Sequence, residues 1–66
     1  MTAVNDQRLR NSLPDRIRAT LCAMGIRQRT GSYSDYERAK AFIRLWDLSA
    51  ADYSLAIKTA ADYIGV

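Results

Sequence analysis

Apolar residues recur at helical spacing in the first well-patterned segment of the chain. They stand four, four and three residues apart, which places them on one face of a helix. These residues are Leu13, Ile17, Leu21 and Met24. Pro14 suits the first helical turn, and Gly25 suits the position just after the last turn. The pattern therefore predicts a helix over residues 14–24.

A wider apolar face follows in the middle of the chain. Its members are Tyr36, Ala39, Ile43 and Trp46, and Phe42 and Leu45 extend it to nearly half the helix circumference. Ser34 and Glu37 stand three residues apart, as in a capping box, where each side chain bonds a free backbone N–H of the other residue. The pattern predicts a helix that begins at Ser34 and ends near Leu48.

The last segment repeats this combination of cap and apolar face. Ser49 and Asp52 have capping-box spacing, and Gly65 is suited to end a helix. The apolar face between them consists of Tyr53, Ala56, Ile57, Ala60 and Ile64. We therefore expect a helix over residues 50–64, and its two alanines would allow a neighbouring helix to approach closely.

The remaining residues allow two interpretations. Residues 1–12 form either a short helix that begins after Asn5 or a flexible basic arm, because Pro14 prevents a smooth continuation into the next helix. No stretch alternates cleanly between apolar and polar residues, as a strand would. We predict an all-α fold, a compact bundle of three to four short helices in a single domain over residues 1–66.

The small size of the chain favours association. A domain of 66 residues buries a modest core and is marginally stable alone. Disulfides and zinc usually stabilise such domains, but the sequence has one cysteine and no histidine. We expect a homodimer, and the apolar residues predicted to form its interface, or to contact another protein, are Phe42, Leu45, Trp46 and Leu55.

The same inventory argues against catalysis. Histidine is the commonest general base and zinc ligand, and it is absent. Cys22 alone cannot build a metal or redox pair, and no glycine-rich phosphate loop is present. We expect a protein that is not an enzyme, with no cofactor, no metal and no small-molecule substrate. We also expect no membrane span and a cytoplasmic location, because the longest uncharged run is short and no secretory pattern is seen.

Positive charge is concentrated in the first half of the chain. Residues 1–30 carry six arginines against two aspartates, whereas the remainder has a small excess of acidic residues. Arginine binds carboxylate and phosphate groups through two parallel hydrogen bonds. The residues predicted to contact an acidic protein or nucleic acid are Arg16, Arg18, Arg27 and Arg29. An ordinary solvated basic face is the alternative interpretation.

These observations favour an interaction module over a sequence reader. In a helix-turn-helix interpretation of residues 43–57, the reading helix would present Asp52 and no arginine, asparagine or glutamine to base edges. We expect a small protein that binds and inhibits or modulates a partner protein or nucleoprotein complex, of the type that phages and mobile elements encode. The alternative is a small DNA- or RNA-binding transcriptional regulator that contacts mainly phosphates.

Overall fold

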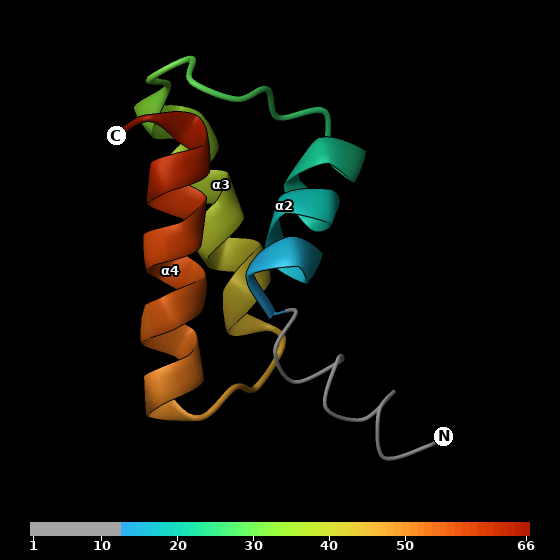
Figure 1. Ribbon diagram of the computed structural model, residues 1–66, viewed down its shortest axis with the longest axis vertical. Coiled ribbons are helices and arrows are strands. Elements are labelled where there is room, and N and C mark those ends of the chain that lie inside the picture. Colours follow the sequence, from blue (N-terminus) through green and yellow to red (C-terminus); the bar gives the residue numbers. More distant parts are fainter. Residues whose placement is uncertain (1–12) are drawn as a thin grey trace.

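The computed structural model describes residues 13–66, which form three helices (Figure 1). Helix α2 spans Leu13–Ala23, α3 spans Tyr33–Arg44 and α4 spans Ala50–Ile64. This part of the chain contains no strand. The predicted compact helical fold is confirmed at this level. The alternatives for residues 1–12, a short helix or a flexible arm, lie outside the described residues.

Helix α4 organises the core, because both α2 and α3 pack against it. In Figure 1, α3 lies beside α4 and runs in the opposite direction. Helix α2 lies to the right of both in this view. The buried apolar residues come from all three predicted apolar faces and from the loop after α2. They are Leu13, Ile17, Leu21, Ile26, Ala39, Ile43, Ala56, Ala60 and Ile64. Ala56 and Ala60 are fully buried, as expected for small residues at close helix contacts.

The end of α2 confirms the predicted role of Gly25. This glycine has a φ of 80°, and its N–H donates to the carbonyl of Cys22. The N–H of Ile26 donates to the carbonyl of Leu21, and both side chains are buried. Together these bonds form a Schellman motif, which satisfies the last carbonyls of the helix and turns the chain back toward the core.

The start of α3 differs from the prediction. The N-cap is Ser32, not Ser34, and the Ser32 hydroxyl accepts a hydrogen bond from the N–H of Asp35 at 3.2 Å. Both serines stand three residues before an acidic residue, so both match the capping pattern. The earlier serine has extended backbone angles, as an N-cap requires. Helix α3 therefore begins at Tyr33.

The end of α3 also differs, because the helix stops at Arg44 and not near Leu48. The N–H groups of Leu45 and Trp46 bond carbonyls three residues back, which tightens the final turn. Asp47 then has a φ of 55°, a conformation outside the right-handed helix that aspartate tolerates better than most residues. Leu45 and Trp46 consequently lie in a turn and not in the helix.

The loop between α2 and α3 is fixed to the C-terminal end of α4. The N–H of Arg29 donates to the carbonyl of Tyr63 at 2.8 Å, and the N–H of Gly31 donates to the carbonyl of Ile64 at 2.7 Å. In return, the Tyr63 hydroxyl donates to the carbonyl of Ile26 at 2.9 Å. These bonds satisfy the terminal carbonyls of α4 and hold Arg29 at a φ of 59°.

The predicted caps of α4 are both present. The Ser49 hydroxyl accepts from the N–H of Asp52, and Gly65 ends the helix with a φ of 90°. A Cβ atom at Gly65 would come within 3.4 Å of the Cα atom of Arg29. Gly65 therefore provides both a left-handed conformation and room for the loop that holds Arg29.

Candidate functional site

Arg16 of α2, Phe42 of α3 and Trp46 of the turn after α3 are in contact, and together with the neighbouring Leu45 they make up what we call the aromatic surface. The rings of Phe42 and Trp46 meet edge to face, with their centres 6.4 Å apart. The guanidinium carbon of Arg16 stands 4.9 Å from the centre of the Trp46 ring, a cation–π contact. The structure thus joins one predicted charged residue to the predicted apolar set.

The residues of the aromatic surface differ in their exposure to solvent. Leu45 is 79% exposed and Phe42 is 39% exposed, whereas Trp46 is partly buried against the core. Leu45 keeps right-handed helical backbone angles two positions after the buried Ile43, so its side chain leaves the helix axis about 200° away from the side that faces the core. The fourth predicted apolar residue, Leu55, is 42% exposed but belongs to α4.

The four predicted contact arginines are all exposed, yet they do not form one patch. Arg16 and Arg18 are two positions apart, so their side chains leave α2 about 200° apart around the helix axis. Arg16 covers Trp46, whereas Arg18 borders a pocket together with Arg29. Arg27 lies in the loop after α2. The structure therefore divides the predicted basic site into separate places.

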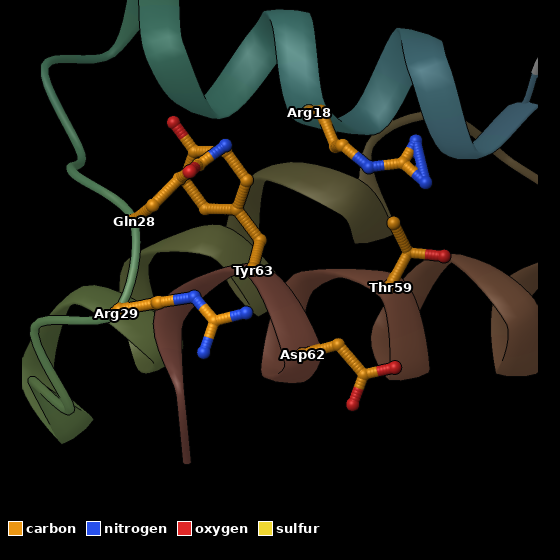
Figure 2. A pocket seen from close by; sticks show the side chains of 6 residues that line it. All are labelled: Arg18, Gln28, Arg29, Thr59, Asp62 and Tyr63. Atoms are coloured by element: carbon orange, nitrogen blue, oxygen red, sulfur yellow. The ribbon is translucent and has the colours of Figure 1, made fainter.

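The pocket has a volume of about 210 Å³ and lies between α2, the following loop and α4 (Figure 2). It is lined by Arg18, Gln28, Arg29, Thr59, Asp62 and Tyr63. Figure 2 shows Arg18 extending along α2 on one side, Arg29 and Asp62 on the opposite side, and the ring of Tyr63 reaching from α4 towards Gln28. Two cations, one carboxylate and three neutral polar side chains thus surround one small space.

The hydroxyl groups of Thr59 and Tyr63 already donate their protons to backbone carbonyls. Thr59 donates its hydroxyl proton to the carbonyl of Leu55 at 2.8 Å, and Tyr63 donates to the carbonyl of Ile26. Since each hydroxyl has one proton, the two oxygens remain as acceptors. Arg18 shares one nitrogen with Asp15 at 2.9 Å, in an exposed ion pair.

The charges of α3 are largely paired within the helix and its immediate neighbours. Lys40 contacts Glu37 at 3.3 Å, and the hydrogen bond to this carboxylate raises the pKa of the Lys40 ammonium above its ordinary value. The Tyr53 hydroxyl accepts a long hydrogen bond from Arg44, which raises the pKa of that guanidinium. Both groups stay protonated at neutral pH. Arg38 contacts Asp35 at 3.2 Å.

Cys22 is exposed, because it lies off the buried face that Ile17 and Leu21 form on α2. Within residues 13–66, no three acidic or thiol side chains lie close enough together to hold a metal ion. No helix in this described part is both long and apolar enough to cross a membrane.

Comparison of the chain with protein-family models, with curated proteins and with solved structures gave no match.

Sequence reasoning did not find four of the pocket residues: Gln28, Thr59, Asp62 and Tyr63. Thr59 lies among polar positions of the α4 pattern, and Asp62 resembles any solvated helix residue. The one available signal was Gly65, since a glycine at the end of a helix has no Cβ atom and leaves room for another backbone segment to come close. That signal gives no information about which loop would approach.

Proposed function

We propose that this protein is a non-enzymatic interaction module that binds a partner protein and inhibits or modulates it. The proposal rests on the aromatic surface, where Arg16 covers Trp46 and the neighbouring Phe42 and Leu45 are exposed. Tryptophan and arginine are among the residues that contribute most to binding energy at protein interfaces. A tryptophan and an arginine in contact beside exposed apolar side chains are typical of the centre of such an interface.

The charge of the molecule favours an acidic partner. The chain has a net charge of +3, and Arg16 adds a cation at the aromatic surface itself. A partner with carboxylates beside an apolar patch would be attracted from a distance and would then bury Phe42 and Leu45. The same net charge opposes the approach of a second copy of this chain.

Affinity capture with matched variants tests the proposal. The double variant Phe42→Asp/Leu45→Asp places two carboxylates on the aromatic surface, and Leu55→Asp is the control on an exposed leucine of α4. Each tagged protein is incubated with lysate of the cells from which it comes, and bound proteins are compared by mass spectrometry. Circular dichroism confirms that each variant has kept its helices.

The expected result is a specific protein that the wild type and Leu55→Asp retain and the double variant loses. Its own activity, measured with and without added module, then shows whether binding is inhibitory. Because Trp46 is the only tryptophan of the chain, its fluorescence should also shift on binding a purified partner that lacks tryptophan. Retention of the same proteins by all three chains would refute the role of the aromatic surface.

A homodimer through Phe42, Leu45, Trp46 and Leu55 stays a prediction. Such a dimer would bury parts of α4 as well as the aromatic surface, since Leu55 belongs to α4. Sedimentation equilibrium of the wild type, the double variant and Leu55→Asp measures it directly. A dimer that both variants dissociate would support the symmetric interface, and a monomer at all concentrations would exclude it.

The regulator that contacts phosphates is a second candidate, and the loop after α2 favours it. Arg27 and Arg29 are exposed there, and neither forms an ion pair with another described residue. Fluorescence anisotropy of labelled DNA between about 50 and 200 mM salt tests this function, because displaced counterions make phosphate binding strongly salt-dependent. Arg27→Glu/Arg29→Glu should abolish such binding. No binding by the wild type at the lowest salt would exclude it.

A further inference from the structure

We propose that the aromatic surface binds an amphipathic helix of the partner, with an apolar pair against Phe42 and Leu45 and one carboxylate on Arg16. The inference rests on the proposed function, because it names the element by which the partner binds. It goes further by fixing the secondary structure of that element and the order of its side chains. A second copy of this chain is the alternative occupant that the experiment also tests.

The apolar residues of the aromatic surface are spaced for contact with a helix. Phe42 and Leu45 are three positions apart, and Leu45 keeps right-handed helical backbone angles. Their side chains therefore leave the axis of α3 about 60° apart and about 4.5 Å along it, as one ridge. Such a ridge fits between the side chains of a second helix. The described part of the chain has no strand, so it offers no sheet edge to an extended peptide.

Helix α2 does not cover this side of α3. Both helices pack against α4, but they scarcely contact each other. Long arginine side chains link the two segments instead. Arg16 reaches the Trp46 ring, and Arg38 donates a hydrogen bond of 3.4 Å to the carbonyl that follows α2. Phe42 consequently stays 39% exposed although it contacts Trp46. A further helix beside α3 would bury Phe42 as neighbouring helices of a bundle do.

The charges near the ridge indicate where the partner places its carboxylate. Arg16 forms no ion pair among the described residues, and its guanidinium lies on the Trp46 ring. Arg38, one turn before Phe42, is already paired with Asp35 at 3.2 Å. Of these two arginines, the one whose charge is not neutralised is therefore at the Trp46 end of the ridge. A guanidinium stacked on a ring still has N–H groups with which to bind a carboxylate.

These positions define a sequence pattern for the partner helix. Two apolar residues three or four positions apart face Phe42 and Leu45, and an aspartate or glutamate follows one turn beyond them on the same face. A second carboxylate at the opposite end is not required, because Asp35 already neutralises Arg38. An extended segment does not place three side chains in this way, since its side chains alternate between two faces.

Peptide selection against the full chain tests this pattern without knowledge of the partner. The probe is a phage-displayed library of random peptides of about 15 residues, roughly four turns of helix. Selection is run in parallel on the wild type, Phe42→Asp/Leu45→Asp, Arg16→Glu and Lys58→Glu. Lys58 is an exposed cation of α4 that forms no ion pair with a described residue, so Lys58→Glu controls for the change in net charge.

The pattern is expected in peptides that the wild type and Lys58→Glu enrich and the double variant does not. Arg16→Glu should select lysine or arginine in place of the carboxylate. In fluorescence anisotropy, a labelled synthetic peptide with the pattern should bind Arg16→Glu at least about threefold more weakly than the wild type. Replacing the carboxylate of the peptide by lysine should reverse this preference. Proline at a peptide position outside the pattern should weaken binding at least about tenfold, because it interrupts a helix.

Several results would overturn the inference. They are no enrichment through the aromatic surface, enriched peptides without the carboxylate or the helical spacing, binding that tolerates the proline, and selection of a carboxylate by Arg16→Glu. A dimer of the free chain that Phe42→Asp/Leu45→Asp dissociates in sedimentation equilibrium would also overturn it, since a second copy would then be the occupant. The expected state is a monomer.

Two controls separate these outcomes from other causes. Melting temperatures show that a variant has stayed folded, and Arg16→Glu should keep that of the wild type, because a carboxylate near the N-terminal end of α2 interacts favourably with the helix dipole. The lysate capture described above is independent of the peptides. A partner that the double variant loses in that capture would leave the proposed function intact even where the helical pattern fails.

Discussion

Replacing Arg29 by glycine should not destabilise this protein, although it removes a large side chain from the pocket. Arg29 has a φ of 59°, in the left-handed region where a residue with a Cβ atom loses about 1–2 kcal/mol. Glycine avoids this cost but gains conformational freedom in the unfolded chain, worth about 0.5–1 kcal/mol. The N–H that bonds Tyr63 remains in the variant. The expected free energy of unfolding is therefore unchanged or about 1 kcal/mol higher.

Arg27→Gly is the matched control for this effect. Arg27 is exposed in the same loop, but it is not among the described residues with a positive φ. Glycine there adds unfolded-state freedom without relieving strain, so the free energy of unfolding should fall by about 0.5–1 kcal/mol. The two variants lose the same side chain and the same charge. Their difference of about 1–2 kcal/mol thus isolates the backbone strain at Arg29.

Urea denaturation followed by circular dichroism measures both variants. In a thermal melt, the same difference should separate the two midpoints by roughly 4–8 °C for each kcal/mol in a domain of this size. Equal stability of Arg29→Gly and Arg27→Gly would refute the reasoning. It would mean that Arg29 is not strained in solution, or that its side chain stabilises the fold as much as its backbone strains it.

Four further substitutions test local features of the fold in the same denaturation assay. Ser32→Ala should lower the free energy of unfolding by about 1 kcal/mol and Ser34→Ala by less than about 0.5 kcal/mol, and equal losses would contradict the assigned N-cap. Tyr63→Phe should lower it by about 1 kcal/mol, because the carbonyl of Ile26 loses its donor, and no loss would exclude this bond. Gly65→Ala should cost at least about 1 kcal/mol through its positive φ, and a neutral result would contradict the close approach to the loop.

Local patterns were sufficient to predict the helices and most of the core. The apolar spacing of Ile17 and Leu21 requires a buried face on α2, and both residues are buried. The same reasoning could not choose between Ser32 and Ser34 as the cap of α3. Both match the pattern, and the decision depends on how the loop reaches the helix.

The candidate site was only partly predictable, because it depends on contacts between distant segments. The exposure of Phe42 and Leu45 follows from the width of one apolar face, which is too broad for all of it to be buried against α4. The contact of Arg16 with Trp46 and the hydrogen bond of Tyr63 to the loop link residues far apart in the chain. Neither has a local sequence signal, since both arise from how the helices pack.

Photo-crosslinking from two matched positions tests the central proposal most directly. p-Benzoyl-phenylalanine replaces Leu45 in one protein and Leu55 in another, both exposed leucines but on different elements. Each is irradiated in lysate of the cells from which the protein comes, and adducts are identified by mass. The account predicts a discrete adduct with a different protein from position 45 and none from position 55. Adducts with a second copy of the chain from both positions, or no adduct from position 45, would contradict it.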